Sequence, residues 1–295
     1  MKIGFVGLGN MGTGMANNIL KNINNKSDLF VYTRTLDKIK NFTERGASGS
    51  SSIEEITNSV DVLLTCLPNV ETSKELFMGK GGIFEYANSE QVLVDHSTVD
   101  VKTSKECFDS ASNKGLNFLD APISGGPGGA ADGTLTIMVG GKESSFNYAN
   151  EAFEMMGSKI SHMGPSGAGT AMKLVNQLLV STNTVAAAEA FVLAEQSGVN
   201  LTAAIDILST SWGRSTMIER NGPITVNKEF ENSPAPLRNL VKDLGIIKDL
   251  TSQLGLKLPV TMASSEVVDE TMGLDLEEPD IAATALSIKK LSNIE

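Results

Sequence analysis

The sequence is poor in the residues that build metal centres and disulfide frameworks. Its 295 residues include only two cysteines and two histidines. Cys66 and Cys107 cannot form a framework of several disulfides. Cys66 lies in an apolar run, where a cysteine typically behaves as a small buried hydrophobic residue. His96 and His162 are too few for a histidine-rich metal site, so we expect no metal ion.

Positive charge is also scarce. The chain has 24 Lys and Arg against 35 Asp and Glu, a formal net charge of -11. A protein that binds nucleic acid or an anionic membrane needs a basic surface, so we expect neither partner. No uncharged apolar stretch has the length of a membrane span, and the chain begins with a strand rather than a signal peptide. These features favour a cytoplasmic protein.

What the sequence does contain indicates two domains. Hydrophobic residues make up 41%, enough for real cores. Short apolar strands alternate with helical stretches in the first half, which is typical of a parallel sheet covered on both faces. Strand signals fade after Ser166 and helical periodicity continues. We predict a Rossmann-type α/β domain over 1–164 and an all-helical domain over 165–295, with a long helix from about 170 to 196 between them.

A glycine-rich turn follows the first predicted strand. The segment has the spacing Gly-x-Gly-x-x-Gly between a strand and a helix, which is the setting of a dinucleotide fingerprint. Gly7 permits a tight turn, Gly9 allows a pyrophosphate to approach, and Gly12 allows close helix–strand packing. The helix start then offers N–H groups to phosphate. The predicted cofactor contacts here are Gly7, Leu8, Gly9, Asn10, Met11 and Gly12.

The tip of the second strand predicts which nicotinamide cofactor binds. In a protein that binds NAD this strand usually ends in an acid that contacts the ribose hydroxyls. Here it ends in Thr33-Arg34-Thr35, without an acid. Arg34 can bind a 2′-phosphate, with a threonine hydroxyl beside it. The sequence therefore favours NADP over NAD, while a simple surface arginine remains the alternative.

Two further strand ends carry candidate ligand residues, because ligands of parallel sheets gather at the carboxyl ends of strands. Leu67, Pro68 and Asn69 follow one strand, and Thr98 follows the next. Asn69, Ser97 and Thr98 are also good helix N-caps, and a cap can contact a ligand as well.

The segment after the strand near 117–121 is almost free of side chains. Ser124, Gly125 and Gly126 can present successive backbone N–H groups to a carboxylate. The alternative is an ordinary flexible hairpin loop before the strand over 134–141.

The long helix begins with a glycine-rich entry and carries three polar candidates. Lys173, Asn176 and Gln177 have the spacing of one helical face in a largely apolar helix. Lys173 lies near the helix start, where the dipole and partial burial would lower its pKa and suit it to proton transfer. The alternative is a lysine that faces water.

Four motifs, taken in order, resemble those of the β-hydroxyacid dehydrogenase family. This family includes 3-hydroxyisobutyrate dehydrogenases, tartronate semialdehyde reductases and glyoxylate/succinic semialdehyde reductases. The resemblance covers essentially the whole chain. The motifs are Gly7-Leu8-Gly9-Asn10-Met11-Gly12, Asp120-Ala121-Pro122-Ile123-Ser124-Gly125-Gly126, Gly167-x-Gly169-x-x-x-Lys173-x-x-Asn176-Gln177 and Lys242-Asp243-Leu244.

The resemblance implies a function and a role for each motif. It implies a dehydrogenase or reductase of small 3-hydroxy acids or semialdehydes, a cleft between domains, and a homodimer or homotetramer. Lys173 would be the general acid or base, and Asn176 and Gln177 would hold it and the substrate oxygen. The substrate carboxylate would bind Ser124, Gly125 and Gly126. The cofactor would be contacted, or the cleft closed over it, by Asn69, Thr98 and Lys242.

The chain also departs from its relatives near the substrate. Many relatives carry a phenylalanine before the late lysine, where this chain has Ser233-Pro234-Ala235-Pro236-Leu237. Trp212 lies in a region that varies with substrate, and we expect it to wall the pocket or to be ordinary core. Arg34 is closer to the glyoxylate/succinic semialdehyde branch.

Two other functions are open at this stage. The first is a decarboxylating enzyme like 6-phosphogluconate dehydrogenase, although that reaction would want more cationic residues and a histidine near Lys173. The second is a dinucleotide-binding protein without turnover, although relatives of that kind tend to lose the lysine.

Overall fold

The structure is a computed structural model that describes residues 1–294. Its internal contacts divide it into two compact units, unit 1 (Met1–Lys173) and unit 2 (Leu174–Glu295). A parallel-dominated sheet with helices in the first part and a helical second part with a long helix confirm the predicted fold class.

Unit 1 is built on a nine-stranded sheet with the order β3-β2-β1-β4-β5-β6-β8-β7, and β9 also pairs with β8. The strands from β3 to β6 are parallel, whereas β8 is antiparallel to β6 and to β7. The strands are β1 (Ile3–Val6), β2 (Leu29–Tyr32), β3 (Ser48–Gly49), β4 (Val62–Thr65), β5 (Val92–Asp95), β6 (Asn117–Asp120), β7 (Ile123–Ser124), β8 (Leu135–Gly141) and β9 (Gly157–Gly164).

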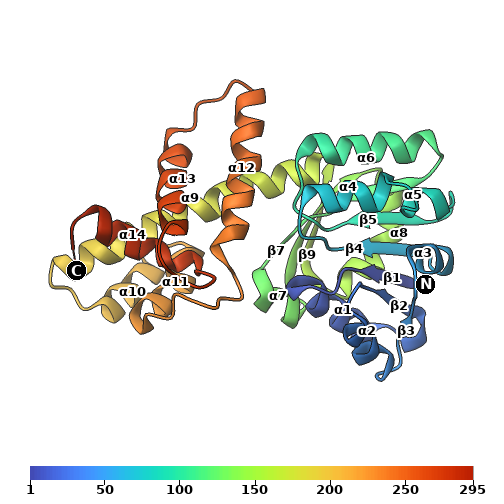
Figure 1. Cartoon of the computed structure of the whole chain (residues 1–295), viewed down its shortest axis with the longest axis horizontal. Coiled ribbons are helices and arrows are strands. Elements are labelled where there is room, and N and C mark those ends of the chain that lie inside the picture. Colours follow the sequence, from blue (N-terminus) through green and yellow to red (C-terminus); the bar gives the residue numbers. More distant parts are fainter. Residues whose placement is uncertain (295) are drawn as a thin grey trace. The chain divides into compact units, whose positions relative to one another are not determined.

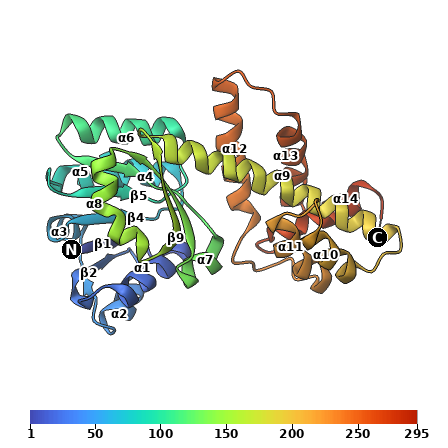
Figure 2. The ribbon, with the colours of Figure 1, turned by 180° about the vertical axis from the view of Figure 1, so that it is seen from behind.

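Helices cover both faces of this sheet (Figure 1, Figure 2). Side chains alternate along each strand, so Leu64 joins one core and Leu63 the other. The first core contains residues of α1 (Asn10–Asn22), α2 (Leu36–Thr43) and α8 (Glu143–Glu154). The second contains residues of α3 (Ile53–Ser59), α4 (Val70–Met78), α5 (Ile83–Tyr86) and α6 (Val101–Asn113).

One sequence expectation about unit 1 is wrong. The glycine-rich segment expected as a loop forms a short helix, α7 (Gly126–Asp132), directly after β7. Pro127 suits a first turn, and Gly133 ends the helix in the left-handed conformation. The helix packs closely on α1, where Asn18 Nδ2 donates to Ala130 O at 2.7 Å. This tertiary contact stabilises a helix that local composition disfavours.

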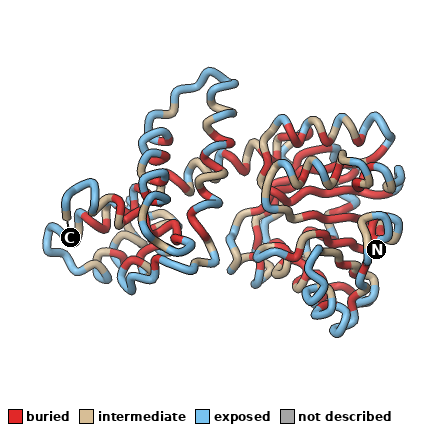
Figure 3. Tube along the Cα trace, viewed as in Figure 1, coloured by how far each residue is buried: buried red, intermediate tan, exposed pale blue. Residues whose placement is uncertain are grey.

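Unit 2 consists of helices around small apolar cores. Val185, Leu240, Leu244 and Val268 form one of them. The helices are α9 (Ala168–Gln196), which begins in unit 1, α10 (Leu201–Thr210), α11 (Thr216–Asn227), α12 (Leu237–Gln253), α13 (Pro259–Met272) and α14 (Thr284–Leu291). Buried positions recur along these helices, as the tube in Figure 3 shows.

The long helix α9 is largely apolar, as its sequence predicts. By length and composition it could cross a membrane, with a window of mean hydropathy 1.3, of which 39% is buried. The uncharged run within it, residues 174–188, is nevertheless shorter than a membrane span. The core helix of a soluble protein passes the same test, so the property is weak evidence for a membrane span.

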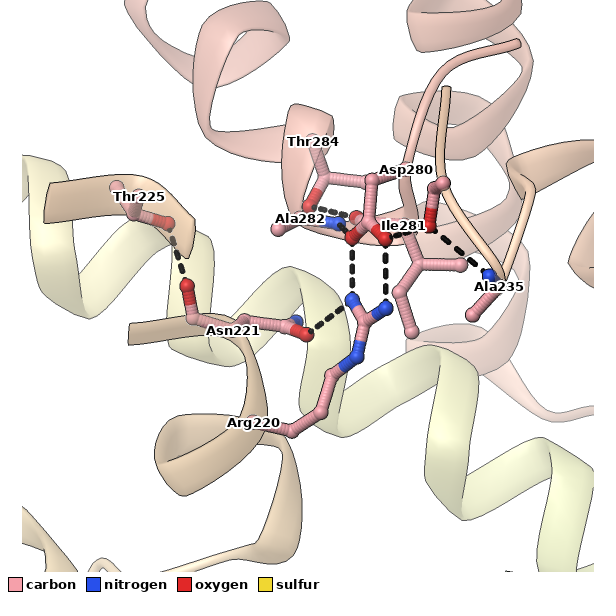
Figure 4. A network of polar contacts seen from close by, with 9 residues as sticks. Arg220, Asn221, Thr225, Ala235, Asp280, Ile281, Ala282 and Thr284 are labelled. Atoms are coloured by element: carbon pink, nitrogen blue, oxygen red, sulfur yellow. Dashed lines mark hydrogen bonds and ion pairs between the residues drawn. The ribbon is translucent and has the colours of Figure 1, made fainter. Parts of the chain in front are cut away.

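An ion pair with a buried carboxylate joins α11 to the C-terminal part of unit 2. Figure 4 shows Arg220 of α11 facing the carboxylate of Asp280, which precedes the short helix η2 (Ile281–Ala283). Arg220 Nη2 lies 2.6 Å from Asp280 Oδ2, and the Ser233 hydroxyl donates to the same carboxylate. The Asp280 side chain is 1% exposed, so its charge depends on these partners.

We predict that Arg220→Ala lowers the free energy of unfolding by about 3 kcal/mol, because it leaves the Asp280 carboxylate buried without its cation. Urea unfolding followed by circular dichroism measures this. The matched control is Arg238→Ala, since the Arg238 and Glu278 side chains are 55% and 50% exposed. That change should cost less than about 1 kcal/mol. Equal losses in the two variants would contradict the prediction.

Candidate active site

The turn between β1 and α1 has room for glycine alone at two positions. Gly7 has φ 99°, and a Cβ there would lie 2.4 Å from the Cys66 carbonyl oxygen. A Cβ at Gly12 would lie 1.9 Å from the Gly7 carbonyl oxygen. Around Gly9, by contrast, a Cβ would meet nothing within 4 Å. The backbone is therefore packed tightly beneath the turn and open to a ligand at Gly9.

The start of α1 offers backbone donors to such a ligand. Gly9 precedes the helix, no side chain caps it among the described residues, and its first turn has no acidic residue. The first N–H groups of a helix have no intrahelical partner and favour an anion such as phosphate. The turn and the helix start together fit the pyrophosphate of a dinucleotide.

Cationic side chains lie around the tip of β2. Arg34 and Thr35 are exposed, and Thr33 is half-buried. Lys38, in the first turn of α2, donates from Nζ to Leu8 O at 2.7 Å. It therefore lies beside the glycine turn. The sequence pattern does not single out Lys38, because its contact with Leu8 spans 30 residues.

The segments after β4 and β5 are held by the buried carboxylate of Asp95. Its Oδ1 accepts from the Thr65 hydroxyl and from Ser97 N, each at 2.9 Å, and its Oδ2 accepts from the Ser73 hydroxyl on α4. The Ser97 hydroxyl accepts from Leu67 N at 2.9 Å. Asp95 thus joins the two segments that contain the candidate cofactor residues Leu67, Pro68, Asn69 and Thr98.

The capping expectation for these segments is half right. Asn69 caps α4 by accepting from Thr72 N at 2.8 Å. Neither Ser97 nor Thr98 caps α6, because that helix begins later, at Val101. Asp100 is its cap and accepts from Thr103 N at 2.8 Å. Ser97 lies at a bend between β5 and α6, and its hydroxyl accepts from Leu67 N instead.

The candidate carboxylate-binding residues lie where β7 ends and α7 begins. Ser124 is half-buried, while Gly125 and Gly126 are exposed. Both glycines have positive φ, 135° and 61°, a conformation that few other residues adopt. A Cβ at Gly126 would meet nothing within 4 Å, so its backbone is open to a ligand.

Lys173 is buried in the second turn of α9, with 7% of its surface exposed. The surface alternative for this lysine is therefore wrong. Asp120, at the end of β6, accepts from Gly167 N at 2.8 Å and from Thr170 N at 2.9 Å. Burial raises the pKa of the Asp120 carboxyl, and these two N–H groups oppose the rise. The start of the lysine-bearing helix is thus bonded to the sheet.

Within unit 2, a buried acid links three of the candidate residues. Asn176 Nδ2 donates to Gln177 Oε1 at 3.1 Å, and Gln177 Nε2 donates to Asp243 Oδ2 at 2.5 Å. Lys242 Nζ lies 3.3 Å from Asp243 Oδ1, an ion-pair distance without hydrogen-bond alignment. Asp243, itself 4% exposed, was visible in the sequence only as the neighbour of Lys242.

Trp212 is not part of a buried wall in the single chain. It lies between α10 and α11 with its side chain fully exposed. The ordinary-core alternative for Trp212 is therefore wrong.

His96 has a structural environment. It is 1% exposed, its Nδ1 lies 2.6 Å from Ala121 O, and its ring meets Phe153 edge-on. Burial lowers the pKa of His96 to about 4, so the ring is neutral at physiological pH. Within residues 1–294, no group of three or more His, Cys, Asp or Glu could hold a metal ion.

Comparison with known proteins places both halves of the chain in one family. Residues 2–164 match the model described as the NAD binding domain of 6-phosphogluconate dehydrogenase. Residues 167–286 match the model described as NAD-binding of NADP-dependent 3-hydroxyisobutyrate dehydrogenase. The chain belongs to the hydroxyacid dehydrogenase family of NAD(P)-dependent oxidoreductases.

Individual relatives extend over nearly the whole chain. Mouse mitochondrial 3-hydroxyisobutyrate dehydrogenase is 34% identical, covering 89% of this chain and 78% of its own. Glyoxylate/succinic semialdehyde reductase 1 of Arabidopsis thaliana is 30% identical, covering 98% and 99%. The structure of Mycobacterium tuberculosis 3-hydroxyisobutyrate dehydrogenase with L-serine superposes with a TM-score of 0.86 at 28% identity, covering 97% and 98%. The protein is thus an NAD(P)-dependent dehydrogenase of this family.

We predict that His96 destabilises the protein in acid. Its pKa is lowered from 6.5 to about 4, so the folded state favours the neutral ring. Its contribution to stability is complete above pH 6.5 and is lost as the pH falls towards 4. The full loss is about 3 kcal/mol, from a shift of roughly 2.5 units. Urea unfolding at pH 7, 5.5 and 4 measures it.

The variant that tests this is His96→Met, which removes the titrating ring at similar volume. Its stability should fall less steeply between pH 6.5 and 4 than that of the parent. His162→Gln is the control and should keep the parental slope, because His96 is intact. An unchanged slope in His96→Met would refute the assignment.

Proposed function

We propose that the enzyme interconverts a small carboxylate-bearing semialdehyde and its hydroxy acid, with NADP as the preferred cofactor and Lys173 as general acid and base. The observation that carries the proposal is the burial of Lys173 in a helix whose start is bonded to the carboxyl edge of the sheet. Lysine side chains are rarely buried in folded proteins unless they are paired, and burial readily shifts the pKa of a lysine.

The cofactor supplies or accepts the hydride when bound. Lys173 donates a proton to the carbonyl oxygen during reduction and removes the hydroxyl proton during oxidation. Ser124, Gly125 and Gly126 bind the substrate carboxylate through hydrogen bonds from the open backbone. Asn176, one turn further along α9, and Gln177 orient the lysine and the substrate oxygen.

The proposed cofactor site uses several segments of unit 1. The glycine turn and the start of α1 hold the pyrophosphate, and the open space at Gly9 supports this role. Arg34 and Lys38 bind the 2′-phosphate, with Thr33 and Thr35 beside them. The NADP-dependent type of the matching C-terminal family model supports the same preference. Further contacts with the cofactor come from Leu67, Pro68, Asn69, Thr98 and Lys242.

The proposed substrate class rests on the carboxylate-binding residues Ser124, Gly125 and Gly126 and not on any one relative. Relatives are named for 3-hydroxyisobutyrate and for glyoxylate or succinic semialdehyde. These molecules share a carboxylate and a nearby carbonyl or hydroxyl group. One carboxylate-binding site can therefore accept any of them. A phosphosugar substrate is disfavoured because Leu174, Val175 and Asn176 place no histidine beside Lys173.

The first experiment is a turnover panel with NADPH and NADH against glyoxylate, succinic, methylmalonic, malonic and tartronate semialdehydes. We expect one of them to be reduced, with NADPH preferred. Lys173→Ala should lower kcat by about 10² to 10⁴ fold, the usual contribution of a general acid. Exposed Lys159 provides the control, and Lys159→Ala should match the parent. A fully active Lys173→Ala variant would remove the lysine from the chemistry.

The same panel tests the cofactor assignment. Arg34→Ala should raise KM for NADPH by about ten-fold or more, since hydrogen bonds to charged groups contribute about 1.5–3 kcal/mol. KM for NADH should change little, because NADH lacks the 2′-phosphate. A parent enzyme that prefers NADH would overturn the assignment. If the parent binds NADPH and reduces none of the five compounds, the substrate lies outside this set.

We also propose that the enzyme is a cytoplasmic homodimer or homotetramer. Large apolar side chains are exposed along α9 and beyond it, at Val175, Leu179, Leu193, Ile207 and Trp212. Surfaces of this kind typically mark protein–protein contacts. The net charge of -11 disfavours binding to nucleic acid or to an anionic membrane instead.

Sedimentation velocity should therefore show a mass of two or four chains of 31.2 kDa. Leu179→Glu should shift the protein towards smaller species, because a charge is costly in an apolar interface. Leu36→Glu, at a position 77% exposed on α2, is the control and should not change the mass. A parent that sediments as one chain would contradict the proposal.

A further inference from the structure

We propose that Asp120 is a positioning residue for Lys173: its buried carboxylate fixes the start of α9 and its charge favours the protonated lysine. The inference rests on the proposed role of Lys173. Asp120 is 2% exposed, and its backbone lies in register with Asp95 on the neighbouring strand. Its side chain takes part in neither the glycine turn nor the segment Ser124–Gly126.

The start of α9 needs a cap from elsewhere in the chain. Gly167 precedes the helix and has no side chain to accept a hydrogen bond. Asp120 takes this role from 47 residues away, with one oxygen on Gly167 N and the other on Thr170 N. The Ser166 hydroxyl lies 3.4 Å from Oδ1. A single side chain therefore binds both ends of the first turn.

Close packing makes this attachment rigid. A Cβ at Gly169 would lie 2.3 Å from Met138 O on β8 and 2.8 Å from Asp120 O on β6. A Cβ at Gly140 would lie 2.6 Å from Asp120 Oδ1. The first turn of α9 thus lies directly on two strands, with the Asp120 carboxylate enclosed beside Gly140. The helix cannot shift without moving these backbones.

Lys173 follows Thr170 by three residues, about one turn along the helix. The Thr170 side chain is 1% exposed and its hydroxyl lies 2.8 Å from that of Ser104 on α6. Any displacement or rotation of the first turn is therefore passed to Lys173, and a shift of about 1 Å in a catalytic group can lower the rate about 100-fold.

The charge of Asp120 has a second effect. The positive end of a helix disfavours an ammonium nearby, and a carboxylate at that end offsets it. A general acid must carry its proton before the reaction, so Asp120 favours the useful form of Lys173. The other titratable groups near this carboxylate are Asp95 at the end of β5, His96 directly after it, and Lys105 on α6. The Lys105 Cε would lie 3.2 Å from a Cβ at Gly167.

The test compares Asp120→Asn with Asp100→Asn. Asp100 also caps a helix through both of its oxygens, by accepting from the N–H and the hydroxyl of Thr103 at the start of α6, but it lies outside the proposed site. In Asp120→Asn we expect kcat to fall about 10- to 100-fold, as for a misplaced catalytic group. KM for NADPH should stay within about three-fold, because the glycine turn is untouched.

The pH profile separates a positioning role from a purely structural one. Removing the negative charge should move the alkaline fall of kcat to lower pH by a few tenths to about one unit. Asp100→Asn should lose thermal stability and keep the parental profile. Gly169→Ala displaces the helix start without changing charge, so it should lower kcat and leave the profile in place.

The outcomes distinguish this inference from the proposed function. A fully active Lys173→Ala variant overturns both. An inactive Lys173→Ala with a parental Asp120→Asn overturns only the role of Asp120. A lower melting temperature in Asp120→Asn with an unmoved pH profile and unchanged kcat makes the residue structural and also overturns it. If Asp120→Asn does not fold, Gly140→Ala displaces the same carboxylate without removing its charge, and a parental kcat in that variant overturns the role of Asp120.

Discussion

The hydrogen bonding of two buried carboxylates at the carboxyl edge of the sheet is the constraint on which unit 1 depends. Asp95 and Asp120 are register neighbours on β5 and β6, and each is almost fully buried. A buried carboxylate costs several kcal/mol unless hydrogen bonds satisfy it. Asp95 obtains them from β4, α4 and Ser97, and Asp120 from the start of α9. The need to satisfy each charge therefore brings separate segments to one edge.

Glycine at the points where a helix meets backbone is the second constraint on unit 1. Gly12 allows α1 to lie against the carbonyl of Gly7, and Gly169 allows α9 to lie against the carbonyl of Met138. In both places a helix begins directly against backbone atoms, of the turn after β1 or of β8, with no room for a Cβ. A glycine packed against a backbone carbonyl thus positions both α1, which would bind the pyrophosphate, and α9, which carries Lys173. Their distances from the sheet are set by backbone contact, which is stiffer than contact between long side chains.

Most of what the sequence predicts about the fold comes from local patterns of apolar residues and glycines. The strands over 3–6, 29–32, 62–65 and 92–95 are continuous apolar runs, and α9 has a glycine entry and an apolar course. The sequence could not show α7, whose stability comes from packing on α1, or β9, whose exposed positions break the apolar pattern. Motifs identified Lys173 and the glycine turn. They missed Lys38 as a neighbour of Leu8 and Asp243 as a partner of Gln177, because contacts across 30 and 66 residues leave no local signal.

The amide pair of α9 illustrates what such a distant partner decides. An amide side chain has a donor end and an acceptor end, and its neighbours determine which end points where. Asp243 can only accept, so Gln177 presents Nε2 to it and Oε1 to Asn176. Asn176 must then donate through Nδ2, which leaves its carbonyl oxygen as the end able to accept. A buried acid on α12 therefore determines the orientation of both amide groups on α9.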